Sequence, residues 1–362
     1  TCALPIYIHL TKGSLIFDAP VFLKNSPLAF TADQGDILFS SCIEGKSSLL
    51  AKAPRGKVVF QGDIGSKEAL SSLFVHAVLI EQYKNIKMAG PLTYQGSIFL
   101  GGNISNSNHK LLFDGPLQIS PSHKISLLVK GKADVIFLSS LEGPGRLSIR
   151  SPEGSVQFNE SIGKNQPLEQ LTINTKHLSL KEIGNGQMAG VGLLDVTATE
   201  SINLHGNSYF SGEQRWKSPQ FNILGRGQIE FNAKNGSIEF SQGILNVENS
   251  SSLSINAIGD LSFVSLKSKA PLDTTFFSLE GELSLGSFLG PLRNLYAKGY
   301  QVVFHDSIRA HNIKVEADTN ICSYASHKLF AHKDIILNAK GGSVASKESS
   351  LGVESSHKIW IG

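Results

Sequence analysis

The side chains best suited to catalysis or ligand binding lie together in the stretch FHDSIRAHNIKVEAD. Its titratable and charged residues are His305, Asp306, Arg309, His311, Glu316 and Asp318. His305 and His311 are six residues apart, so on an extended strand they share one face about 20 Å apart. That separation is too large for both to ligate one metal ion. We expect a solvated outer face without a metal, and keep His305, Asp306 and His311 as candidate ligand contacts.

A catalytic pair of carboxylates is not evident in the sequence. Glycosidases need two carboxylates about 5–10 Å apart, and calcium-assisted lyases need clustered acids and a base. On stacked strands these acids come from Asp-Asp or Asp-x-Asp pairs, and the sequence contains neither. Its aspartates are instead single, as at Asp63, Asp114, Asp134, Asp195, Asp260, Asp306, Asp318 and Asp334. A Ser/His/Asp triad stays open because serine is abundant, but we predict no catalytic residue and find no Gly-x-Ser-x-Gly elbow.

Glycine-rich segments that resemble cofactor loops lack the required context. Gly45-Lys46-Ser47 could pass for the end of a phosphate-binding loop, but that loop needs a glycine where Ser40 stands. The Gly-x-Gly pairs at 143–145 and 190–192 lack the strand–helix–strand setting of a dinucleotide site. We therefore read these segments as polar turns and corners, and predict no cofactor.

Two aromatic residues occupy matching places in related segments. AGPLTYQGSIFL and SGEQRWKSPQFNI align so that Gly90 matches Gly212 and Tyr94 matches Trp216. An aromatic residue at a fixed place in a repeat most often stacks in the interior or covers a corner. The alternative is a platform for a sugar ring, so Tyr94 and Trp216 are also candidate ligand contacts.

The elements that must position these residues are short strands in a repeat. The pattern Gly-x-apolar-x-apolar begins at Gly13, Gly35, Gly56, Gly96, Gly154, Gly227, Gly236, Gly259 and Gly281. Several gaps between these glycines are 21 to 23 residues. Alternating side chains put one strand face inside, and a unit this small must stack on its neighbours. The sequence thus predicts an all-β fold, a right-handed parallel β-helix (β-solenoid) with coils of about 22 residues.

A longer motif extends this pattern. GSVQFNESIGKNQPLEQLTI, beginning at Gly154, recurs 98 residues earlier from Gly56 and in shortened form from Gly281. We expect the three glycines to occupy equivalent places in their coils. A carboxylate one coil after Asp36 could stack on it, but the sequence offers Lys57 there, 21 residues later.

Composition restricts the class of protein and its partners. The 362 residues carry a net charge of +3 with well-mixed signs, which does not indicate a nucleic-acid partner. The three cysteines form no CxxC motif and indicate neither a zinc site nor a disulfide framework. No apolar run is long enough for a transmembrane helix. The opening TCALPIYIHLTKG lacks the features of a signal peptide, so we expect a fragment of a longer chain.

Along the chain we find no domain boundary and predict one continuous β-helix segment over 1–362. The segment 67–88 has helical propensity, but its sister copy contains Pro167 and so favours strand. We expect a loop-rich stretch at 101–124, and breaks near 116–124 and 268–274 where loops leave the coil. Loops at 101–124 and 264–276 are the expected binding elements.

The 154–173 motif resembles the repeat of large bacterial exported proteins, the filamentous-haemagglutinin-like and autotransporter-passenger adhesins. The resemblance covers 56–100, 154–223 and 281–304, and the rest of the chain is similar to these proteins only in its general sequence character. It implies a non-enzymatic structural adhesin, extracellular or on the bacterial cell surface. Its implied partners are a protein or glycan on a host or neighbouring cell and an outer-membrane export barrel, in cis or in trans. A β-helical polysaccharide lyase or glycoside hydrolase and a self-associating filament or scaffold are the alternatives.

Overall fold

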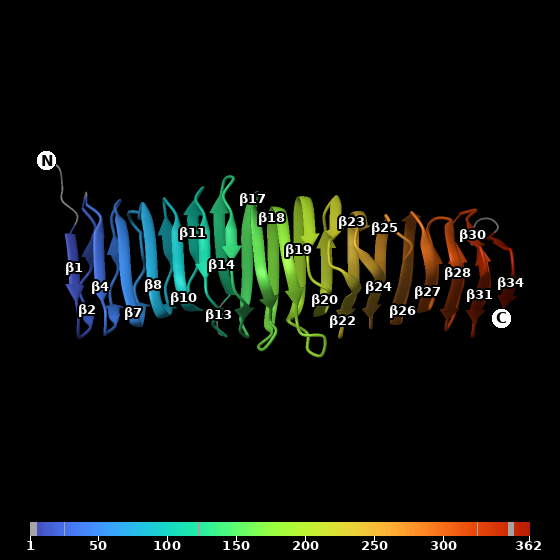
Figure 1. Cartoon of the computed structure of the whole chain (residues 1–362), viewed down its shortest axis with the longest axis horizontal. Coiled ribbons are helices and arrows are strands. Elements are labelled where there is room, and N and C mark those ends of the chain that lie inside the picture. The colour runs from blue at the N-terminus through green and yellow to red at the C-terminus, as the bar shows by residue number, and fades with distance from the viewer. Residues whose placement is uncertain (1–5, 25, 122–123, 324, 347–350) are drawn as a thin grey trace. The chain divides into compact units, whose positions relative to one another are not determined.

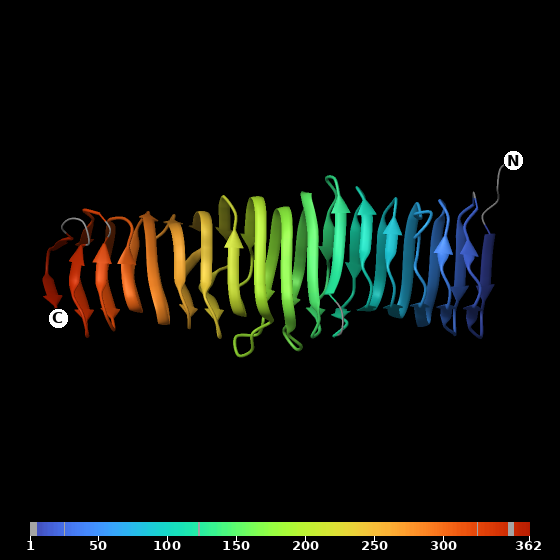
Figure 2. The same cartoon turned by 180° about the vertical axis from the view of Figure 1, so that it is seen from behind.

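The computed structural model describes residues 6–24, 26–121, 124–323, 325–346 and 351–362. In these residues it contains strands, turns and bends but no helix, so the all-β prediction is confirmed (Figures 1 and 2). The chain divides into two compact units, Thr1–Ser179 and Leu180–Gly362. The predicted strand at 67–88 is confirmed for 72–82 and 86–88, where buried positions alternate with more exposed ones, whereas 67–71 form bends and one isolated bridge.

The strands of the first unit are short and follow one another closely. They are β1 (Ile6–Leu10), β2 (Leu15–Phe17), β3 (Val21–Phe22), β4 (Leu28–Ala32), β5 (Ile37–Phe39), β6 (Ile43–Glu44), β7 (Ser48–Phe60), β8 (Ser72–Gln82), β9 (Ile86–Met88), β10 (Leu92–Leu100), β11 (Ile104–Ser107), β12 (Leu111–Asp114), β13 (Leu117–Ile119), β14 (Lys124–Lys130), β15 (Val135–Phe137), β16 (Leu141–Glu142) and β17 (Arg146–Ile162). The division between the units falls within β18 (Leu168–Ile183).

The second unit continues the same kind of element. Its strands are β19 (Val191–Leu204), β20 (Ser208–Lys217), β21 (Gln220–Ile223), β22 (Gly227–Ala233), β23 (Ile238–Val247), β24 (Ser250–Ala257), β25 (Leu261–Ser268), β26 (Leu272–Leu289), β27 (Leu292–Phe304), β28 (Ile308–Ala317), β29 (Ile321–Ser323), β30 (Lys328–Ala331), β31 (Asp334–Ala339), β32 (Val344–Ser346), β33 (Gly352–Ser355) and β34 (Lys358–Ile361). The longer strands bend at corners and contribute to more than one face of the coil.

In the first unit, parallel pairing stacks these strands into three faces. Face 1A carries β1, β4, β12, β15, the first halves of β7, β8 and β10, and the 156–158 segment of β17. Face 1B carries β2, β5, β13, β16 and the second halves of β7, β8 and β10. Face 1C carries β3, β6, β9, β11, β14 and the start of β17.

The register of face 1B gives the length of a coil. Leu15 pairs with Ile37, Ile37 with Val58, and Val58 with Ile80, which are steps of 22, 21 and 22 residues. The first unit is therefore a parallel β-solenoid with the predicted period.

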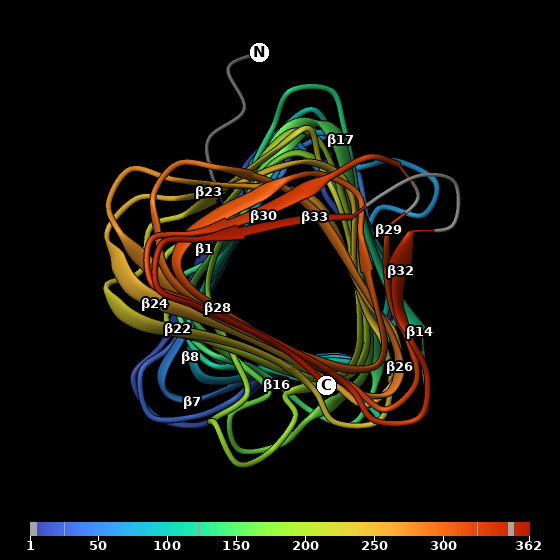
Figure 3. The same cartoon turned by 90° about the vertical axis from the view of Figure 1, so that its right-hand side faces the viewer.

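The second unit is built in the same way. Face 2A carries β22, β24, β31, β34 and the 273–278, 294–299 and 313–317 segments. Face 2B carries the first part of β19, the end of β20, β29, β32 and the 238–240, 261–263, 283–285 and 302–304 segments. Face 2C carries β21, β30, β33 and the 308–310 segment. Viewed from the C-terminal end, the chain passes anticlockwise from β32 through β33 to β34 as it advances toward the viewer, which is a right-handed coil (Figure 3).

Apolar side chains fill the inside of both units. Phe17, Phe39 and Phe60 stack with ring centroids 5.0 and 5.2 Å apart and interplanar angles of 9° and 6°. This spacing matches the distance of about 4.8 Å between neighbouring strands of a sheet. The same side-chain type in successive coils therefore forms a continuous column, and Tyr209 and Phe231 form a similar pair in the second unit at 4.8 Å.

The long motif does not recur at one position of the coil. Gly56 precedes the segment 58–60 on face 1B, whereas Gly154 precedes 156–158 on face 1A. Gly281, in the second unit, precedes a segment of face 2B that pairs with β25. The expectation of equivalent coil positions was therefore wrong. Within the first unit, the 98-residue offset moves the motif to a neighbouring face, because each coil has three corners of similar construction.

What the three glycines share is a close approach to the preceding coil. A Cβ on Gly56 would lie 2.1 Å from the carbonyl oxygen of Gly35, and one on Gly154 would lie 2.0 Å from that of Ala133. At Gly281 it would lie 2.5 Å from the backbone of Asp260. The motif therefore marks a corner packed against the coil before it, where a side chain cannot fit.

The expected loops are more regular than their composition suggested. The stretch 101–124 forms β11, β12 and β13 with buried apolar side chains, and Ser122 and His123 lie outside the described residues. Residues 264–276 lie mostly in β25 and β26, and only 269–271 separate these two strands. The expected binding loops at 101–124 and 264–276 are therefore parts of ordinary coils, since their turn-forming residues occupy corners.

Candidate functional site

Several aspartates that stand alone in the sequence hold one coil to the next. Asp36 Oδ1 accepts a hydrogen bond from the backbone N–H of Lys57 at 2.8 Å. Asp134 Oδ1 and Asp260 Oδ1 accept equivalent bonds from Ser155 and Glu282, at 3.1 and 2.8 Å. The prediction that Lys57 follows Asp36 by one coil is confirmed. These carboxylates satisfy backbone donors at corners, where the ladder of strand hydrogen bonds is interrupted.

Two glutamates separated by the same 98 residues perform a related task. Glu44 accepts hydrogen bonds from the backbone N–H groups of Lys67 and Glu68, both at 3.0 Å, and from the Ser66 hydroxyl. Glu142 likewise accepts bonds from Asn165 and Gln166, at 3.1 and 2.9 Å. Each glutamate side chain therefore holds a turn of the following coil.

The electrostatics of Glu44 reflect this arrangement. Burial raises the pKa of Glu44, but hydrogen bonds from the Glu68 N–H, the Ser66 hydroxyl and the Lys67 N–H outweigh burial. The pKa of Glu44 is therefore held below its ordinary value. Its carboxylate is a structural anion at neutral pH.

The two matched aromatic residues point into the solenoid. Tyr94 is fully buried and donates its hydroxyl hydrogen to Gln82 Oε1 at 2.9 Å. Trp216 is also buried and donates its indole N–H to Gln214 Oε1 at 3.0 Å. Both glutamine amides donate to backbone carbonyls. Tyr94 and Trp216 thus occupy the interior, with their polar atoms engaged, and neither presents a ring to a ligand at the surface.

The predicted cluster at 305–318 is spread over different faces of the second unit. His305 follows the end of β27, and its Nε2 lies 2.7 Å from Ser284 Oγ. His311 lies in β28 at the corner between faces 2C and 2A, with its ring centroid 6.5 Å from that of His332. The two histidines are therefore not brought to one site. Among the described residues, no group of three or more His, Cys, Asp or Glu side chains is placed to hold a metal ion.

Two serine residues donate hydrogen bonds to the Asp306 carboxylate. A hydrogen bond from the Ser287 hydroxyl and another from the Ser307 N–H lower the pKa of Asp306, with a smaller effect from nearby His327. Its carboxylate is thus engaged by serine groups.

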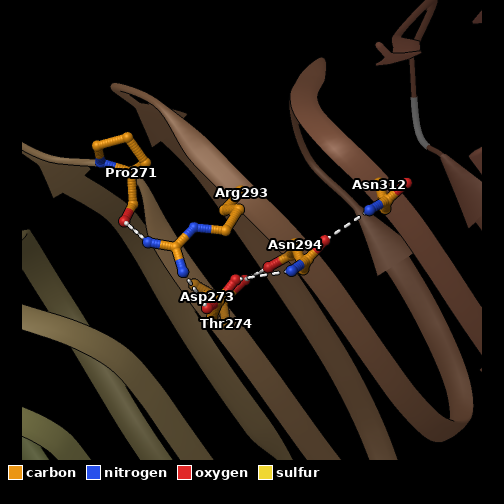
Figure 4. Close-up of polar contacts among 6 residues, drawn as sticks. All are labelled: Pro271, Asp273, Thr274, Arg293, Asn294 and Asn312. Atoms are coloured by element: carbon orange, nitrogen blue, oxygen red, sulfur yellow. Dashed lines mark hydrogen bonds and ion pairs between the residues drawn. The ribbon is translucent and has the colours of Figure 1, made fainter. Parts of the chain in front are cut away.

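A ladder of polar side chains crosses three coils of the second unit, as Figure 4 shows. Asn294 Nδ2 donates to Asp273 Oδ1 at 2.8 Å, and Asn312 Nδ2 donates to Asn294 Oδ1 at 2.7 Å. Arg293 pairs with Asp273 at 3.0 Å and donates to the carbonyl of Pro271 at 3.3 Å. Each member is bonded to the adjacent coil, so this ladder stabilises the stack and offers few free groups to a ligand.

An apolar groove lies on the outside of face 1B. Its volume is about 440 Å³. It is lined by Ser14, Ile16, Asp36, Leu38, Lys57, Val59, Gln61, Glu81 and Tyr83. Ile16, Leu38 and Val59 occupy the same register position in three successive coils, between inward-facing neighbours. The sequence carried a signal for this groove, because the tags GSLIF, GDILF and GKVVF have apolar residues at the outward position as well.

A second, more polar groove lies on face 2B and gathers carboxylates. It has a volume of about 260 Å³ and is lined by Glu213, Gln214, Arg215, Ser237, Ile238, Glu239, Asp260 and Ser262. Glu213 pairs with Arg215 at 2.7 Å, and Asp260 Oδ1 accepts the Glu282 N–H. In the described part of the chain, Glu239 is the carboxylate of this groove without such a partner. Two of the three acids are therefore occupied by structural contacts.

Comparison of the chain with protein-family models, with curated proteins and with solved structures finds no match. Within the described residues, the structure contains no helix that is long and apolar enough to cross a membrane.

Proposed function

We propose that this chain is a structural, adhesive β-solenoid of a bacterial surface-exposed or secreted protein. In this role it binds a protein or glycan on a host or neighbouring cell. The observation that carries the proposal is the groove on face 1B, where Ile16, Leu38 and Val59 form an outward-facing apolar row.

Exposure falls along this row, because Leu38 is half-buried and Val59 is only 6 % exposed, so Ile16 and Leu38 are the side chains that a partner would cover. Ile16 is 60 % exposed, and covering an apolar side chain of this size contributes about 1.5–3 kcal/mol. Lys57 and Glu81 lie at the edge of the row and pair with each other at 3.6 Å, which gives the groove a polar rim. Apolar floors with polar rims are typical of protein interaction surfaces.

The placement outside the cell is supported by the motif at 154–173, which resembles the repeats of filamentous-haemagglutinin-like and autotransporter-passenger adhesins. The solenoid fold is compatible with that resemblance. An export barrel in the outer membrane, in cis or in trans, belongs to the same proposal.

Retention on surfaces tests the proposal. The purified chain is passed over immobilised host cells and over arrays of glycans and cell-surface proteins, and its retention is measured. We expect retention of the native chain and at least tenfold weaker binding of Ile16→Asp/Leu38→Asp, since two apolar contacts are lost. Leu279→Asp, which changes an exposed leucine of the second unit, serves as the matched control. Absence of retention on every surface, or equal weakening by Leu279→Asp, contradicts the proposal.

A carbohydrate-active enzyme is the second candidate, favoured by the carboxylates of the face 2B groove. Glu239 would then be the acid or base, since Glu213 and Asp260 are already engaged. A depolymerisation assay on acidic and neutral glycans separates the two candidates. Chain cleavage that Glu239→Gln abolishes supports the enzyme, and retention without cleavage supports the adhesin.

A further inference from the structure

Strands β30 and β33 lie side by side on face 2C (Figure 3). A third groove lies on the outside of this face, across β28, β30 and β33. Its volume is about 410 Å³. It is lined by Arg309, Phe330, Ala331, His332, Glu354, Ser355 and Ser356. Arg309, Phe330 and Glu354 share one register position in successive coils, so their side chains project from the same side of the sheet.

Arg309 is the cation of this groove that is not neutralised. Its guanidinium lies over the Phe330 ring, 5.2 Å from the centroid, and it forms no ion pair within the part of the chain that the structure describes. Glu354, the acid of the groove, pairs instead with Lys328 at 3.3 Å. The Arg309 guanidinium is therefore available to a planar anion. A guanidinium binds such an anion through two parallel hydrogen bonds.

The other polar groups of the groove suit a hydroxylated ligand. The Ser355 and Ser356 hydroxyls donate to the backbone carbonyls of Lys333 and His332. Ser355 Oγ also accepts the His357 N–H at 3.2 Å, so it keeps one further lone pair. This lone pair and those of Ser356 Oγ can accept hydrogen bonds from ligand hydroxyls. His332 adds an imidazole beside them. The Arg309 guanidinium and the Lys328 ammonium lie over the Phe330 ring, 5.2 and 5.7 Å from its centroid, so Phe330 holds the two cations at this groove.

We propose that this groove binds a carboxylate-bearing sugar, with Arg309 on the carboxylate and His332, Ser355 and Ser356 near the ring hydroxyls. The groove holds one free guanidinium, and the chain as a whole carries mixed charge, so it suits a single carboxylate per sugar better than a dense polyanion. This inference rests on the proposed adhesive function and specifies a glycan as the partner at this groove.

Calorimetric titration of the full chain tests the inference. The acidic probe is an unsulfated hexasaccharide of alternating glucuronic acid and N-acetylglucosamine. The neutral probe is a hexasaccharide of N-acetylglucosamine, and inorganic phosphate is the simple-anion probe. We expect the acidic probe to bind at least tenfold more tightly than either other probe, and Arg309→Gln to weaken its binding about tenfold, the value of one charge-assisted contact. Arg309→Lys should restore part of the affinity.

The control is Arg226→Gln, because Arg226 is an exposed arginine of the same unit outside this groove. It should leave binding of the acidic probe unchanged. Equal binding of acidic and neutral probes, equal binding of phosphate, or an equal loss with Arg226→Gln overturns the inference. Cell retention that survives Arg309→Gln while the acidic probe does not bind refutes only the sugar site. Binding of the acidic probe without cell retention refutes only the adhesive role.

Discussion

Removal of the Glu44 carboxylate should open the turn at Ser66–Glu68 without unfolding the first unit. Glu44 is 3 % exposed and accepts the backbone N–H groups of Lys67 and Glu68. Glu44→Ala deprives both N–H groups of their acceptor, which costs about 1–3 kcal/mol for each buried group. The turn itself is exposed, so water replaces part of the lost bonding. We therefore expect the lower end of that range for each group, about 2–3 kcal/mol in total.

Hydrogen exchange measured by mass spectrometry on peptides spanning 62–73 reads out this local opening. A loss of about 2–3 kcal/mol corresponds to exchange roughly 30- to 140-fold faster at the amides of Lys67 and Glu68. Glu68→Ala is the matched control, because its exposed side chain has no described partner and its N–H keeps the Glu44 acceptor. Native-like protection in Glu44→Ala, or equal deprotection in Glu68→Ala, would refute the assigned role.

The pH dependence of this effect has a defined sign. The pKa of Glu44 is lowered in the folded protein from its ordinary value of 4.5. The carboxylate therefore adds stability above pH 4.5, and that stability is lost as the pH falls through the folded pKa. The difference in exchange between the native chain and Glu44→Gln should be present at pH 7 and shrink as the pH falls below 4.5 and through the lowered folded pKa of Glu44.

Three further predictions concern the packing of the coils. Gly154→Ala should destabilise the first unit by about 1–3 kcal/mol in chemical denaturation, because its Cβ would meet the Ala133 carbonyl oxygen at 2.0 Å. The control Gly352→Ala should have little effect, because its Cβ would meet only the flexible side chain of Lys328. Tyr94→Phe should cost about 1–3 kcal/mol in the same assay, because the buried Gln82 Oε1 loses its donor, and unchanged stability would contradict the assigned bond. Burial raises the pKa of Tyr94 and of Tyr209, so both phenols should stay protonated above pH 10 until unfolding in a spectrophotometric titration, and stability should fall as the pH rises above 10.

The alternation of apolar residues and the 22-residue period were sufficient to predict the solenoid. Strands such as β5 and β22 follow directly from their Gly-x-apolar-x-apolar tags, and the period matches the register between Leu15, Ile37 and Val58. These features are local, so they can be read without knowing which coil lies beside which.

The face of the coil on which each copy of the motif lies could not be predicted in the same way. Gly56 and Gly154 have the same local surroundings, and only the register shows that one precedes face 1B and the other face 1A. The roles of Glu44 and Asp134 depend on backbone groups about one coil later in the sequence. A scan for acid pairs within one strand does not detect such contacts, because each acid has a partner in the neighbouring coil.

The residues of the candidate sites were likewise predicted only in part from the sequence. Tyr94 was correctly expected in the interior because aromatic residues in repeats stack there, and its bond to Gln82 required the folded register. Ile16 and Leu38 were visible in the sequence as apolar residues at outward positions. The groove that they form was not predicted, because the alternation was used to identify the inward residues of each strand.

The register between neighbouring coils is the central structural claim, and paired cysteines test it directly. In a chain whose native cysteines are replaced by alanine, Ile16→Cys/Leu38→Cys joins register partners about 4.8 Å apart, within the range for a disulfide. Ile16→Cys/Ser40→Cys offsets the pair by two residues and brings it beyond about 7 Å. Under mild oxidation we expect the register pair to cross-link in the folded chain and the offset pair to remain reduced. Cross-linking of the offset pair as readily as the register pair would contradict the stacked-coil structure.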